Sequence, residues 1–135
     1  MNYYNTVLVE MGFQEAIEKV TSELGKEGFG VLTEIDVKST LKKKLDVDFR
    51  PYKILGACNP NFAHKALLLE NKIGTMLPCN FIVQELDGGM VEISAINPLV
   101  SMKSVNNPDL ESIAAEVALK LGNVLNAVNS EKIAK

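Results

Sequence analysis

The segment Asp87-Gly88-Gly89 constrains the fold of this chain more than any other part of the sequence. These residue types accept the positive φ angles that a tight hairpin turn requires. The flanking residues 80–86 and 90–96 have the apolar and β-branched content of strands. Because two strands joined by so short a turn run antiparallel, the sequence predicts a mixed or largely antiparallel sheet.

The remaining segments alternate between the two periodicities that distinguish strands from helices. Apolar residues at every second position predict strands at 3–10, 29–36 and 52–58. Apolar residues at every third or fourth position predict helices at 13–24, 37–45, 60–71 and 110–128. Asn59-Pro60 and Asn107-Pro108 each combine a favoured N-cap with a proline suited to the first helical turn. This order predicts an α+β fold with helices on one face of the sheet, whose other face must be polar or covered by a partner.

Length and composition predict one globular domain. The chain has 135 residues, of which 47% are hydrophobic and 23% charged, which is ordinary for a folded domain. No linker, internal repeat or low-complexity segment divides it. We expect a single domain at 1–128 and a polar C-terminal tail at 129–135.

The charge balance and the N-terminus bear on partners and location. The formal net charge is −3, which lacks the cationic footprint of a nucleic-acid binder. No apolar run is long enough to cross a bilayer, and no basic segment followed by an apolar run precedes the first strand. We therefore expect a cytoplasmic protein without nucleic-acid or membrane partners, whose two cysteines are reduced at rest.

Three segments resemble one known family. They are GFGVLTEIDV at 28–37, YKILGACNP at 52–60 and LPCN at 77–80. Together they are similar to the bacterial and archaeal family called domain of unknown function 302. The resemblance implies a β-α-β(4)-α core on a curved, mostly antiparallel sheet of the TATA-binding-protein-like fold group, and it implies a homodimer. It implies no activity, because the family has no established biochemical function.

Cys58 and Cys79 are the residues that most invite a chemical interpretation. Cys58 precedes the predicted start of a helix, where exposed amides and the helix dipole lower the pKa of a thiol. If the two strand ends meet, the cysteines form a redox pair or a two-thiolate site for copper(I). The alternative is that both are small buried side chains of the core. With one histidine in the chain, a classical structural zinc site is not expected, and we predict no metal and no cofactor.

Asn59 and Asn80 each follow a cysteine and complete two Cys-Asn pairs. Asn59 is explained by its role as a helix cap. Asn80 has no helix to cap, so its amide either satisfies turn backbone groups or contacts a ligand. We therefore take Cys58, Asn59, Cys79 and Asn80 as the candidate ligand or thiol site.

Three weaker candidates remain. Glu34 and Asp36 share one face of a predicted strand, as in acid–base pairs, although a solvated strand face explains them equally. His64 would have to fold back toward Cys58 to form a nucleophile pair, and a solvated helical histidine is the alternative.

Three hypotheses for function follow. The first is a non-enzymatic homodimer that binds a small molecule or partner near the two Cys-Asn pairs. The second is a thiol-based redox enzyme or sensor that uses Cys58 and Cys79. The third is a structural interaction module whose open sheet face is covered by a second copy. No catalytic constellation in the sequence favours an enzyme.

Overall fold

The computed structural model describes the backbone of residues 1–134 and the side chains of residues 1–129. Its centre is a five-stranded sheet in the order β1-β5-β4-β3-β2, in which every neighbouring pair is antiparallel. The strands are β1 (Tyr4–Val9), β2 (Gly30–Asp36), β3 (Tyr52–Cys58), β4 (Cys79–Glu85) and β5 (Val91–Ile96).

The hairpin prediction is confirmed. β4 and β5 pair antiparallel through the turn at residues 86–90, in which Gly88 and Gly89 have φ angles of +90° and +86°. Side chains with a Cβ atom adopt such angles at a cost, so the glycines permit the tight connection. The predicted α+β class is also confirmed.

The described residues also form five α-helices and three short 3-10 turns. The helices are α1 (Phe13–Lys26), α2 (Val37–Leu45), α3 (Pro60–Leu69), α4 (Pro98–Ser101) and α5 (Glu111–Ala134). The 3-10 turns are η1 (Ile73–Met76), η2 (Met102–Val105) and η3 (Pro108–Leu110), and α4, η2, η3 and α5 follow the last strand. The sequence patterns did not predict α4. Helix α5 continues to Ala134, into the segment 129–135 that we expected as a tail, and Lys135 lies outside the described residues.

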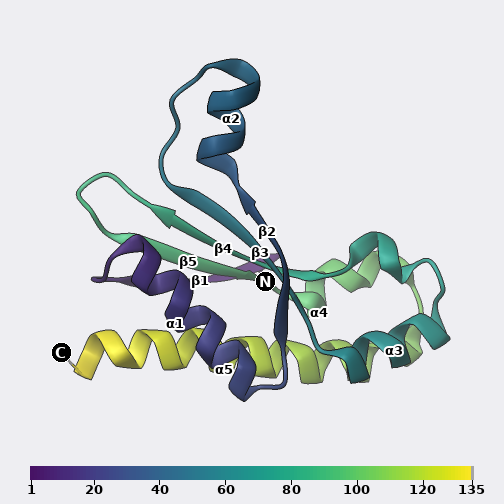
Figure 1. Ribbon diagram of the computed structural model, residues 1–135. Helices are drawn as coiled ribbons and strands as arrows, with labels where there is room; N and C mark the ends of the chain where they lie inside the picture. The colour runs from purple at the N-terminus through teal and green to yellow at the C-terminus, as the bar shows by residue number, and fades with distance from the viewer. Residues whose placement is uncertain (135) are drawn as a thin grey trace.

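The main core lies between one face of the sheet and the helices α1 and α5, which both run below the sheet in Figure 1. Each of these elements contributes fully buried side chains, such as Leu24 from α1, Val124 from α5 and Phe81 from β4. Burial of each large side chain contributes about 1.5–3 kcal/mol to folding. The opposite face carries no such helical layer in the part of the chain that the structure describes (Figure 1).

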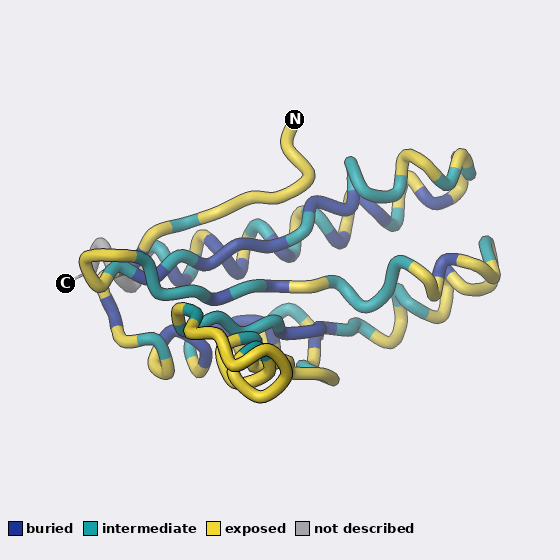
Figure 2. Tube along the Cα trace, turned by 90° about the horizontal axis from the view of Figure 1, so that it is seen from above, coloured by how far each residue is buried: buried dark blue, intermediate teal, exposed yellow. Residues whose placement is uncertain are grey.

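A second, smaller cluster extends the core beyond the end of the sheet. Ala66, Ile73 and Leu110 are its buried members, and they come from α3, η1 and η3. This cluster holds α3 beside the sheet end, at the right of Figure 1. In contrast α2 contributes no buried residue and stands out as an exposed coil in Figure 2.

Among the described residues, no helix combines the length and apolar character needed to cross a membrane.

Candidate functional site

Both cysteines line one cavity of about 300 Å³ at the end of the sheet. The register of β3 and β4 pairs Ala57 with Cys79, so Cys58 is the next residue after the position opposite Cys79. β3 ends at Cys58 and β4 begins at Cys79, so both strand ends reach the same cavity. We call this cavity the thiol pocket.

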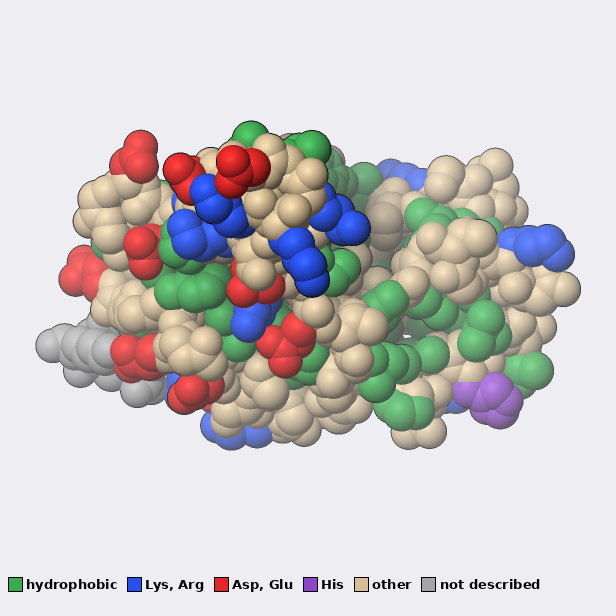
Figure 3. All heavy atoms as spheres, turned by 45° about the horizontal axis from the view of Figure 1, so that its top comes forward, with side chains coloured by type: hydrophobic (Ala, Val, Ile, Leu, Met, Phe, Trp, Pro, Cys, Tyr) green, Lys and Arg blue, Asp and Glu red, His purple; other side chains and the backbone are tan. Residues whose placement is uncertain are grey.

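The walls of the thiol pocket are apolar and come from several elements. Phe29 directly precedes β2 and Leu32 belongs to it, whereas Ala63 and Leu67 come from α3 and Val117 from α5. Leu32 and Leu67 are also largely exposed, so they form the rim. In Figure 3, hydrophobic side chains surround a hollow between the sheet and α3, the helix that carries the histidine. The complete lining is Phe29, Leu32, Ala57, Cys58, Asn59, Phe62, Ala63, Ala66, Leu67, Leu77, Pro78, Cys79, Pro98, Met102, Ile113, Ala114 and Val117.

The surroundings of Cys79 disfavour its thiolate form. Burial, together with the nearby Cys58, raises the pKa of Cys79 to about 11. The thiolate is the nucleophile and the metal ligand, so a thiol with this pKa is protonated at neutral pH. Cys79 therefore contributes a polarisable apolar surface to the pocket.

Pro78, the residue before β4, lies close against β3 at Gly56. A Cβ atom added to Gly56 would collide with the hydroxyl of Thr33 and come within 2.7 Å of Pro78 Cγ. Glycine is therefore required at position 56 for Pro78 to lie against β3. Pro78 lines the thiol pocket and directly precedes Cys79.

Asn59 has the capping role that the sequence suggested. Its Oδ1 accepts hydrogen bonds from the backbone N–H groups of Asn61 at 3.2 Å and Phe62 at 3.4 Å. These bonds satisfy amides that the first turn of α3 leaves without helical partners. Asn59 also lines the thiol pocket, so this one side chain both caps α3 and forms part of the pocket wall.

Asn80 is separated from the other three candidate residues. It is exposed on β4 and does not line the thiol pocket. It faces a different hollow of about 310 Å³, between η1 and α4, which Cys79 also lines. The structure thus brings together Cys58, Asn59 and Cys79 and places Asn80 outside their cavity.

The weaker candidates have structural roles. Glu34 forms an ion pair with Lys53 at 3.4 Å, and Asp36 Oδ1 accepts a hydrogen bond from the N–H of Ser39 at 2.9 Å, which caps α2. His64 is exposed on α3 and lines none of the cavities described here. Among the described residues, no three His, Cys, Asp or Glu side chains group as metal ligands would.

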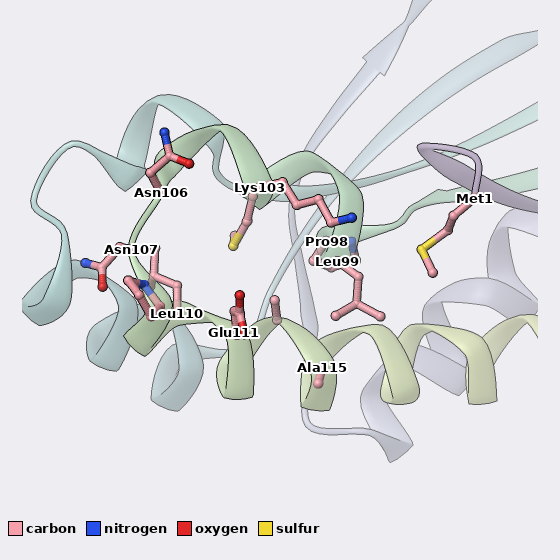
Figure 4. A pocket seen from close by; sticks show the side chains of 12 residues that line it. Met1, Pro98, Leu99, Lys103, Asn106, Asn107, Leu110, Glu111 and Ala115 are labelled. Atoms are coloured by element: carbon pink, nitrogen blue, oxygen red, sulfur yellow. The ribbon is translucent and has the colours of Figure 1, made fainter.

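A larger cavity of about 820 Å³ adjoins the thiol pocket (Figure 4). The two cavities share Pro98, Met102 and Ala114 as lining residues. The larger one also contains polar groups, including Lys103 from η2 and Glu111 from α5. A more polar cavity therefore lies next to the apolar one.

The sequence did not identify the apolar residues that line the thiol pocket together with the two cysteines. Ala63 and Leu67 lie on α3, where the apolar periodicity predicted a helix but gave no sign of a pocket. Met102 follows α4, a helix that the sequence patterns did not predict. The run Leu67-Leu68-Leu69 could have indicated the pocket, because three consecutive leucines cannot all face the core from one helix. All three are exposed in the structure.

Comparisons with known proteins identify the family. The family model for the domain of unknown function DUF302 matches residues 5–128. A crystal structure of an uncharacterised conserved DUF302 protein from Bacillus stearothermophilus is 34% identical to this chain and has a TM-score of 0.87. The match covers 93% of this chain and 98% of that one. No curated protein matches the chain. The chain therefore belongs to the DUF302 family of domains of unknown function.

Proposed function

We propose that this chain binds a small, mainly apolar molecule in the thiol pocket. The observation that carries this proposal is the pocket itself, an apolar cavity of about 300 Å³ whose few polar groups include Asn59 and the two thiols. Concave apolar cavities with a few polar groups are the usual form of small-molecule sites.

The volume limits the size of the ligand. An apolar cavity of about 150 Å³ in another protein holds benzene. A cavity twice as large accommodates a body of about two or three rings, or an acyl chain of similar volume. A polar group attached to that body would extend past Met102 into the larger cavity, toward Lys103 and Glu111 (Figure 4).

The pKa of Cys79 favours binding over thiol chemistry. A resolving cysteine attacks the sulfenic acid of its partner as a thiolate and forms a disulfide. A thiol with a pKa of about 11 is almost entirely protonated at neutral pH, so it makes this attack slowly. The redox hypothesis is therefore the second candidate. It is supported by the single observation that both thiols line one cavity.

Fluorescence titration with N-phenyl-1-naphthylamine tests the proposal. This neutral aromatic probe becomes fluorescent in apolar surroundings and is about the size of the cavity. We expect saturable binding to the wild-type chain and at least about a tenfold loss of affinity in Ala63→Phe, since half-buried Ala63 lines the pocket and a phenyl ring there would fill it. Ala63→Leu is a milder filling variant that should give a smaller loss.

Ala118→Phe is the matched control, because Ala118 is also a half-buried helical alanine but lines none of the described cavities. Its probe affinity should equal that of the wild type. Equal binding by Ala63→Phe and Ala118→Phe, or no binding by the wild type, would refute the site. A mass loss of two hydrogens after mild peroxide treatment of the native protein would instead show a Cys58–Cys79 disulfide and favour the redox hypothesis.

A further inference from the structure

A thin partition separates the apolar thiol pocket from the larger cavity of about 820 Å³. Pro98, Met102 and Ala114 line both cavities, so single residues separate the two spaces there. Methionine is unbranched and its side chain adapts readily to its surroundings. Met102 is therefore the part of the partition that an elongated ligand displaces most easily.

The larger cavity is lined by two charged side chains of opposite sign, Lys103 from η2 and Glu111 from α5. In Figure 4, Glu111 rises from α5 toward the η2 side of the hollow, and Lys103 extends along that side toward Pro98. Both side chains are exposed, and within the described residues neither forms an ion pair. Both charges are therefore free to interact with a ligand.

The two charges also lie beside the partition. Lys103 directly follows Met102 in the chain. Glu111 precedes Ala114 by three residues on α5, a spacing that places two side chains on the same side of a helix. A molecule that extends from the thiol pocket past Met102 therefore brings its end between an ammonium group and a carboxylate.

This pair of charges discriminates between head groups. A head group with a single charge is attracted by one of the two side chains and repelled by the other. A head group that carries both an ammonium and a carboxylate is attracted by both, provided that each group faces its counterpart. The cavity of about 820 Å³ is much larger than such a head group, so water remains around it and each ion pair contributes the modest amount of a solvated pair.

We infer that the ligand is an apolar α-amino acid, whose side chain fills the thiol pocket while its carboxylate faces Lys103 and its ammonium group faces Glu111. This inference rests on the proposed function, because it requires an apolar body in the thiol pocket. It adds the chemical class of the ligand, and it assigns Lys103 and Glu111 as the residues that select the head group.

Displacement of bound N-phenyl-1-naphthylamine by ligands that share one alkyl tail tests the inference at neutral pH, below micellar concentrations. The ligands are 2-aminodecanoate with both charges, decanoate with a negative charge, decylamine with a positive charge and uncharged decanol. The wild-type chain should bind 2-aminodecanoate at least about threefold more tightly than decanoate or decylamine.

Substitution of each charged residue should affect a different pair of ligands. Lys103→Met should weaken the binding of 2-aminodecanoate and decanoate about threefold, and Glu111→Gln should weaken that of 2-aminodecanoate and decylamine by a similar factor. Only 2-aminodecanoate should lose affinity in both variants. Because both positions are exposed, both variants should fold, and they should bind decanol and N-phenyl-1-naphthylamine as the wild type does.

Lys43→Met on α2 and Glu116→Gln on α5 are the matched controls. Lys43 and Glu116 are exposed and line none of the cavities described here, so these variants should leave every affinity unchanged.

The outcomes separate this inference from the proposed function. A wild-type chain that does not bind N-phenyl-1-naphthylamine would refute both. If the probe binds, but 2-aminodecanoate binds no more tightly than decanoate and decylamine, the thiol pocket stands and the amino-acid inference is overturned. The inference is also overturned if Lys103→Met and Glu111→Gln bind 2-aminodecanoate as tightly as the wild type does.

Discussion

Raising the pH should destabilise this protein through Cys79. Burial and the neighbouring Cys58 raise the pKa of this thiol from an ordinary value of 9.0 to about 11 in the folded state. Between these two values the unfolded chain loses its proton and the folded chain keeps it. The folded state then binds more protons than the unfolded state, so the free energy of unfolding falls as pH rises.

The size of the effect follows from the pKa difference. One pKa unit corresponds to about 1.36 kcal/mol, so a shift of about two units gives an upper limit of about 2.7 kcal/mol. This stabilisation is fully present below pH about 9 and is lost progressively as the pH approaches about 11. Below pH 8 the contribution of Cys79 should not change with pH.

Urea unfolding of the wild type and Cys79→Ala at several pH values between 7 and 10.5 measures the effect. Lysines and tyrosines also titrate in this range, but they are common to both proteins and cancel in the difference. The wild type should lose more stability with rising pH than Cys79→Ala, by about 1–2 kcal/mol at pH 10.5. In Cys58→Ala the loss should be slightly smaller than in the wild type, since the Cys58 charge is the second cause of the shift. Parallel pH profiles for the wild type and Cys79→Ala would refute the reasoning.

Three further predictions concern stability. Gly56→Ala should lower the free energy of unfolding by about 1–3 kcal/mol, because the added Cβ would meet Pro78. An unchanged midpoint of urea unfolding would contradict this packing. Asn59→Ala should cost about 1 kcal/mol through the lost cap of α3, with Asn59→Asp as the variant that restores stability. A hydrogen bond from Lys26 lowers the pKa of Glu23, so stability should fall below pH about 4.5, and less steeply in Glu23→Gln, as acid titration followed by circular dichroism would show.

Local chemistry explains which parts of the fold could be predicted. The glycine turn at 87–89 specified the antiparallel β4–β5 pair, and Asn59-Pro60 marked the start of α3. These signals depend on residues a few positions apart. Helix α4 and the turn η2 are too short to show a periodicity, so their contribution of Pro98 and Met102 to the pocket wall could not be foreseen.

The candidate site shows the same limit. Asn59 and Asn80 occupy identical places after a cysteine, yet Asn59 caps a helix beside the thiol pocket and Asn80 faces another hollow. Strand register and the end of β3 decide this difference, and both depend on contacts between distant segments. The TATA-binding-protein-like grouping and the cytoplasmic location stay predictions from the sequence.

The most direct test of the account is an amide chemical-shift titration of the folded, isotope-labelled chain with N-phenyl-1-naphthylamine. The thiol-pocket proposal predicts saturable shifts concentrated in the segments 57–67, 77–79 and 113–117, which contain most of the residues that line the cavity, and their loss in Ala63→Phe. The absence of shifts, or shifts confined to the sheet face opposite α1 and α5, around Ile54 and Ile82, would contradict the proposal that this chain binds small molecules between its two cysteines and α3.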